Sequence, residues 1–133
     1  MSQNGYAQYQ RSQLLTASPA KLLLASYDGA IRFARIASER MKEKNLYEQN
    51  KYINKTLAIV SELMSTLRDD LDPVFSSRLR SLYLYSIKKL AQANLEGDQE
   101  ALAEVIKILS DLREAWGKAE QTLQQQAIEE AAA

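Results

Sequence analysis

The 133-residue chain contains no cysteine and no histidine. Without cysteine it has no disulfides, no thiolate nucleophile and no sulfur ligand for a metal. Without histidine it has no Ser-His, Cys-His or His-metal arrangement, and none of the inward Glu-x-x-His pairs that hold di-iron sites in helical bundles. We therefore expect no catalytic residue, no metal and no cofactor, and the sequence predicts that the protein is not an enzyme.

Glycine and proline are scarce, with four glycines and two prolines. The glycines stand far apart, so no glycine-rich phosphate-binding loop is present. The clustered carboxylates Asp69, Asp70 and Asp72 are expected to be solvated and to cap the next helix rather than to act as an acid–base pair. With so few breakers, most of the chain can form long helices.

Charge of one sign and long hydrophobic runs are also missing. Lysine plus arginine equals aspartate plus glutamate, 17 against 17, so no net charge favours nucleic acid or an anionic membrane. No apolar run is longer than four residues, as in Leu22 to Ala25, which is far shorter than the roughly 20 residues of a membrane span. No secretory signal pattern opens the chain. We expect a cytoplasmic protein that neither binds nucleic acid nor spans a membrane.

What the chain does contain is helical periodicity. Apolar residues recur at spacings of three and four, and prolines follow the cap residues Ser18 and Asp72. Gly97 and Asp98 form a stop and a new cap. Helices are expected over 19–44, 47–70, 73–95 and 98–123. Similar lengths and short links predict an all-α, antiparallel up-down four-helix bundle. The bundle should cover residues 16–123, with a frayed tail over 124–133 and an N-terminal segment, 1–15, packing on or over it.

The first predicted helix has two apolar stripes, of which one suffices for a bundle core. The core stripe contains Leu24, Tyr27, Ile31, Ala34 and Met41. The second contains Leu22, Ser26, Gly29, Phe33 and Ile36. The small residues Ser26 and Gly29 should leave a dent at its centre, which either a neighbouring helix of the bundle or another protein could fill. Tyr6 and Tyr9 in the tail are one helical turn apart and could dock into a groove or simply cover the end of the bundle.

Several blocks of the sequence resemble the flagellar secretion chaperones of the FliS family. These blocks are Thr16-Ala17-Ser18-Pro19, Leu22-Leu23-Leu24, Tyr27-Asp28-Gly29-Ala30-Ile31-Arg32-Phe33, Leu82-Tyr83-Leu84-Tyr85, Ala93-Asn94 and Leu112-Arg113-Glu114-Ala115-Trp116. Tyr6 and Tyr9 also stand where this family tends to carry tyrosines. The chain departs from the family pattern at Ala25-Ser26, where larger apolar residues are usual.

The resemblance implies a cytoplasmic chaperone that binds the disordered C-terminal segment of flagellin, prevents premature polymerisation and assists delivery to the flagellar export apparatus. Other export or regulatory proteins would be further partners. The rival interpretation is a self-associating structural or adaptor module, a homodimer for example, that binds another amphipathic helix. The residues predicted to contact a partner are Tyr6, Tyr9, Leu22, Ser26, Tyr27, Gly29, Ala30 and Phe33.

Overall fold

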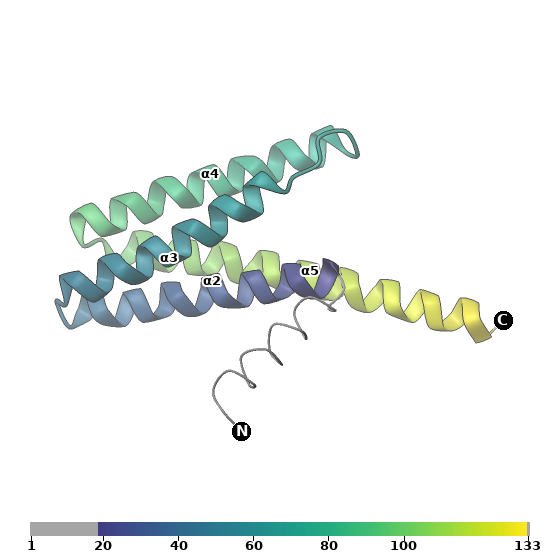
Figure 1. Ribbon diagram of the computed structural model, residues 1–133, viewed down its shortest axis with the longest axis horizontal. Coiled ribbons are helices and arrows are strands. Elements are labelled where there is room, and N and C mark those ends of the chain that lie inside the picture. Colours follow the sequence, from purple (N-terminus) through teal and green to yellow (C-terminus); the bar gives the residue numbers. More distant parts are fainter. Residues whose placement is uncertain (1–18, 133) are drawn as a thin grey trace, which may run out of the picture.

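A computed structural model describes residues 19–132, which form a bundle of four α-helices (Figure 1). The helices are α2 (Pro19–Lys42), α3 (Leu46–Ser65), α4 (Pro73–Glu96) and α5 (Gln99–Ala132). Successive helices run in opposite directions, and contacts join α2 to α3, α3 to α4, α4 to α5 and α5 back to α2. The predicted antiparallel four-helix bundle is therefore confirmed. The predicted packing of residues 1–15 and the cap at Ser18 lie outside the described residues.

The starts of α4 and α5 follow the predicted cap signals. The Asp72 side chain accepts a hydrogen bond from the Phe75 backbone N–H at 3.1 Å, and Pro73 occupies the first turn of α4. Gly97 ends α4 with φ 64°, a left-handed conformation in which a glycine avoids the clash of a β-carbon. The Asp98 carboxylate then accepts from the Ala101 N–H at 3.0 Å. Both links are fixed by local chemistry.

The end of α3 differs from the prediction, because the helix stops at Ser65 rather than near Asp70. The Ser65 hydroxyl donates to the Glu62 carbonyl and the Thr66 hydroxyl to the Leu63 carbonyl, both at 2.7 Å. Hydroxyls that bond the last carbonyls of a helix compete with the next turn of backbone bonds. Residues 66–72 consequently form an irregular link between α3 and α4.

The end of α5 also differs, because the helix continues to Ala132 instead of ending near Leu123. Its last part extends beyond the other three helices (the yellow end in Figure 1). Every side chain from Gln121 to Ala132 is exposed. The predicted loss of an apolar face is therefore present, but it leaves an uncovered helix rather than a change of backbone conformation.

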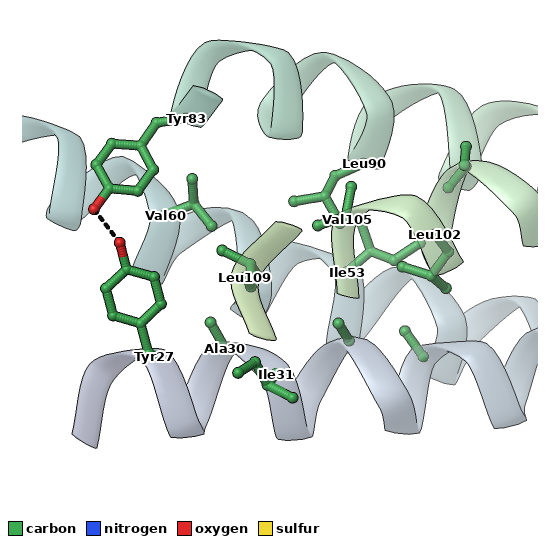
Figure 2. Packing of buried hydrophobic residues seen from close by; sticks show 14 of the residues in the cluster. Tyr27, Ala30, Ile31, Ile53, Val60, Tyr83, Leu90, Leu102, Val105 and Leu109 are labelled. Atoms are coloured by element: carbon green, nitrogen blue, oxygen red, sulfur yellow. Dashed lines mark hydrogen bonds between the residues drawn. The ribbon is translucent and has the colours of Figure 1, made fainter. Parts of the chain in front are cut away.

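The core runs along the bundle axis (Figure 2). On the α2 side it is built from alanines at positions 30, 34 and 37, all fully buried, which let the neighbouring helices approach closely. The larger fully buried apolar side chains facing them are Ile53, Val60, Leu90, Leu102, Val105 and Leu109. Burial of each such side chain contributes roughly 1.5–3 kcal/mol. Within residues 19–132 no helix combines the length and the apolar character that crossing a membrane requires.

Candidate protein-binding site

An apolar pocket of about 250 Å³ lies at the end of the bundle where α2 begins and the link 66–72 joins α3 to α4. We call it the end pocket. Leu23 of α2, Leu67 of the link and Leu79 of α4 contribute aliphatic side chains. Phe75, Tyr83 and Trp116 add aromatic rings. Every helix thus contributes to this end, and the early stop of α3 leaves irregular chain as one side of the pocket.

A second apolar hollow, of about 410 Å³, lies between α4 and α5, and we call it the α4–α5 groove. Arg78 is its only charged lining residue. It is otherwise lined by Phe75, Leu79, Leu82, Leu112, Ala115, Trp116 and Ala119. Phe75, Leu79 and Trp116 line both hollows. The end pocket and the α4–α5 groove therefore form one continuous apolar surface.

Phe75 and Trp116 stand at the junction of the two hollows. Their ring centroids are 5.9 Å apart and the ring planes meet at 87°, an edge-to-face contact. The Trp116 indole N–H donates to the Tyr27 hydroxyl at 3.2 Å, which fixes the orientation of the ring from the core side. Phe75 is 48% exposed although it is a large aromatic residue. The junction thus offers an exposed ring beside one that is held in place.

The hydroxyls of Tyr27 and Tyr83 are 2.5 Å apart beneath this surface (Figure 2). Both side chains are almost completely buried, at 0% and 1% exposed. Burial raises the pKa of Tyr27 and of Tyr83 above the ordinary tyrosine value. Both phenols therefore stay neutral and hydrogen-bonded, and they act as a fixed support for Trp116.

The exposed members of the predicted partner-binding set lie on α2, away from Phe75 and Trp116. Leu22 is 39% exposed, and its carbonyl accepts from the Ser26 hydroxyl at 3.0 Å. Phe33 is half-buried beside Tyr52 of α3, with ring centroids 5.9 Å apart. The structure thus joins Leu22 to Ser26 but does not gather the set into one groove.

The remaining described members are occupied by the bundle itself. Tyr27 and Ala30 are fully buried in the core, so they offer no surface to a partner. A β-carbon on Gly29 would lie 3.5 Å from Cδ1 of Ile59, so α3 fills the dent. The sequence allowed either a neighbouring helix or another protein to pack at this position, and in the structure the neighbouring helix α3 packs there. Gly29 itself is only half-buried, so its contact with a partner stays a prediction. Tyr6 and Tyr9 lie outside the described residues.

Phe75, Leu79 and Leu82 were not among the binding residues predicted from the sequence. Their spacing of four and three was a usable signal, because it defines an apolar stripe on α4 next to the buried residues Tyr83 and Ser86. On α5, Leu112 and Trp116 are only half-buried. Periodicity alone did not show that the stripes on α4 and α5 would meet.

The side chains of this surface are suited to binding another molecule by apolar contact and not to catalysing a reaction. It consists of aliphatic and aromatic side chains, with a few charges at its border. Among residues 19–132, no group of three or more acidic side chains is placed to hold a metal ion. A helical bundle with an extended apolar surface belongs to the class of protein-binding modules.

The comparisons with known proteins name the family. The family model described as flagellar protein FliS matches residues 2–123. The flagellar secretion chaperone FliS of Bacillus subtilis is 33% identical over 120 residues, covering 90% of this chain and 89% of its own length. The corresponding protein of Campylobacter jejuni is 32% identical over 111 residues, covering 84% of this chain and 87% of its own length. The chain belongs to the FliS family.

A solved structure agrees with the fold. It is described as a crystal structure of a flagellar chaperone from bacteria and superposes with a TM-score of 0.74. The alignment covers 90% of this chain and 97% of that one, at 18% sequence identity. At this identity the likeness supports the bundle architecture.

Proposed function

We propose that this protein is a cytoplasmic export chaperone that binds the disordered C-terminal segment of flagellin. It keeps flagellin from polymerising early and assists its delivery to the flagellar export apparatus. The observation that carries the proposal is the continuous apolar surface of the end pocket and the α4–α5 groove. The relatives named flagellar secretion chaperones supply the class of client.

The shape of the surface favours an extended or helical segment over a folded domain. An amphipathic helix docks by placing its apolar side chains into a groove between two helices. The α4–α5 groove offers such a trough, and the end pocket continues it past Phe75 and Trp116. Ordering a disordered client costs about 2–5 kcal/mol, so the client must bury side chains in both hollows to bind usefully.

In this proposal, residues 1–15 cover the end pocket when no client is bound, with Tyr6 and Tyr9 in contact with it. The support is the attachment point, because α2 begins at Pro19 and Leu23 in its first turns lines the end pocket. The chain from Tyr9 to Pro19 can span at most about 35 Å, which is enough to reach the hollow. The tail and the client would then compete for one surface.

Calorimetry with a peptide from the flagellin C-terminus tests the client site. Leu82→Asp places a charge in the α4–α5 groove and should weaken binding at least about tenfold. Leu95→Asp is the matched control, because Leu95 is on the same helix, is 86% exposed and lines neither hollow. The proposal fails if the unmodified protein shows no binding at high micromolar peptide, or if both variants bind equally well.

Deleting residues 1–15 tests the tail. Binding of the flagellin peptide should become stronger or stay the same, since the deletion removes a competitor. Severe weakening in a protein that keeps its helical circular dichroism would show that the tail is part of the client site. Light scattering of the free and mixed protein also separates a chaperone–client complex from the self-associating module considered above.

A further inference from the structure

A third hollow, of about 520 Å³, lies between α2 and α5, and we call it the α2–α5 groove. It shares no lining residue with the end pocket or the α4–α5 groove. Ile31 and Ile36 give it apolar side chains. Its border is charged, with four arginines at positions 32, 35, 40 and 113 against the acidic residues Asp28 and Glu39. The groove is therefore amphipathic and carries net positive charge.

Arg32 and Arg35 form no ion pair with the described residues, whereas the other two arginines are paired. Arg113 pairs with Asp28 at 2.8 Å, and Arg40 pairs with Glu43 at 2.8 Å. Arg35 is exposed and forms no ion pair with any residue in 19–132. The Arg32 guanidinium lies 5.2 Å from the Phe33 ring centroid. It has no carboxylate partner among these residues. An anion entering the groove meets these two cations first.

Ser110 supplies a second observation at the wall of the groove. Its hydroxyl oxygen is buried and has no hydrogen-bond partner within the described part of the chain. A buried hydroxyl without a partner is unfavourable. The wall of the groove therefore contains a polar group that the bundle itself leaves unsatisfied.

We propose that the α2–α5 groove binds an acidic amphipathic segment of a partner protein, independently of the client site. Ile31 and Ile36 would pack against apolar side chains of the occupant, and Arg32 and Arg35 would pair with its carboxylates. A phosphate polymer fits less well, because it has no apolar side chains to pack against the two isoleucines. Charge complementarity together with the apolar lining thus selects a peptide.

The two surfaces can be occupied at the same time because α5 faces both. Ser110 and Arg113 line the α2–α5 groove, whereas Leu112 and Trp116 line the α4–α5 groove. A partner on the first surface therefore leaves the apolar client contacts free. The protein would connect a client to a second protein through different faces of one helix.

Fluorescence anisotropy with two labelled helical peptides of about 14 residues, or four turns, tests the proposal. Both have leucines along one face, but the first has glutamates and the second lysines along the other. The full-length protein should bind the Leu/Glu peptide, more weakly as salt rises, and bind the Leu/Lys peptide at least about tenfold less tightly. Equal binding of the two peptides would overturn the proposal, because charge would then not select the occupant.

Arg35→Glu locates the site. It should weaken Leu/Glu binding about tenfold or more, whereas Lys88→Glu, an equal charge change at an exposed position on α4, should not. Leu82→Asp should leave Leu/Glu binding unchanged, and Arg35→Glu should leave flagellin-peptide binding unchanged. An effect of Leu82→Asp, or none of Arg35→Glu, would place the peptide elsewhere and overturn the proposal. So would polyphosphate binding that depends on Arg35 while the Leu/Glu peptide fails to bind.

Discussion

The hydroxyls of Tyr27 and Tyr83 meet at 2.5 Å and join α2 to α4 across the bundle. Figure 2 shows the two rings reaching toward each other from the two helices. The Tyr27 hydroxyl also accepts from Trp116 of α5, so it has two partners, whereas the structure gives the Tyr83 hydroxyl one. Tyr27 is therefore the centre of a network that ties three helices together.

Removing the Tyr27 hydroxyl should cost more stability than removing that of Tyr83. Tyr27→Phe leaves the Tyr83 hydroxyl buried without its partner and also frees the Trp116 N–H, for a loss of about 2–3 kcal/mol. Tyr83→Phe leaves Tyr27 bonded to Trp116 and should cost about 1 kcal/mol. Urea unfolding measures both, and tryptophan emission should shift only in Tyr27→Phe.

Tyr85→Phe is the matched control for these two substitutions. The Tyr85 hydroxyl donates to Glu104, but the side chain is 38% exposed, so water can replace the bond. Its free energy of unfolding should change by less than about 0.5 kcal/mol. Equal losses in Tyr27→Phe and Tyr83→Phe would contradict the central position of Tyr27.

The same tyrosine pair predicts a loss of stability at alkaline pH. Burial raises the pKa of both phenols in the folded state, while an unfolded tyrosine ionises near pH ~10. The folded protein thus holds protons that the unfolded chain releases. The contribution of the pair to stability is fully present below pH ~10 and falls above it, by up to about 1.4 kcal/mol per pH unit for each tyrosine.

Urea titrations between about pH 8 and pH 11 should show this fall in the unmodified protein. The double variant Tyr27→Phe, Tyr83→Phe should have a flatter pH profile. All other ionisable groups are present in both proteins, so their effects cancel in the difference. Parallel pH profiles would mean that the two phenols do not carry the effect.

Two glycines should respond to alanine in opposite directions. Gly29→Ala adds a methyl group at an ordinary contact distance of 3.5 Å from Ile59 and removes a flexible residue from a helix interior. It should raise the free energy of unfolding by about 0.5–1 kcal/mol. Gly97→Ala forces a β-carbon into φ 64° and should lower it by roughly 1–2 kcal/mol.

Thermal unfolding followed by circular dichroism compares the two variants under one condition. Flagellin-peptide binding should be unchanged in Gly29→Ala, because Ile59 already fills the space beside Gly29. Weaker binding in a stable Gly29→Ala protein would restore the partner-binding dent that the structure assigns to the bundle.

The uncovered end of α5 should be dispensable for folding. Deleting residues 121–133 removes side chains that are exposed from Gln121 to Ala132, so the free energy of unfolding should change by less than about 0.5 kcal/mol. Deleting residues 112–133 is the contrasting variant, because it also removes Leu112 and Trp116, which pack against the core. Equal destabilisation by both deletions would show that the exposed end supports the bundle.

The fold was predictable because its signals are local. Asp72-Pro73 and Gly97-Asp98 specify helix ends through backbone hydrogen bonds and a left-handed glycine, and both ends are where the sequence placed them. The stop at Ser65 was missed, although it is also local, because side-chain hydroxyls interrupted a stripe that continued as far as Leu71. Apolar periodicity indicates which face of a helix is buried, but it does not show that side-chain hydroxyls compete for the last backbone carbonyls.

The candidate site was less predictable because it depends on which helices become neighbours. An apolar stripe indicates that a helix face is buried, but it does not indicate which helix or partner buries it. Ile59 of α3 packs beside Gly29, while Phe75 and Trp116, from separate helices, meet in a partly exposed contact. Tyr27 belongs to a block that resembles the family, yet its contribution is to hold Trp116 from inside the core.

The early stop of α3 gives the end pocket walls of unequal stiffness. All four helices contribute to its wall, but one part is the link 66–72, which contributes Leu67, Arg68 and Leu71. The link is fastened to α4 where the Ser76 hydroxyl bonds the Arg68 carbonyl and where Arg80 pairs with Asp69, both at 3.0 Å. After these fastenings the side chains of Asp70 and Leu71 are exposed, so the backbone there can rotate without repacking the core. The aperture can therefore adjust to client side chains of different size while the bundle keeps its shape.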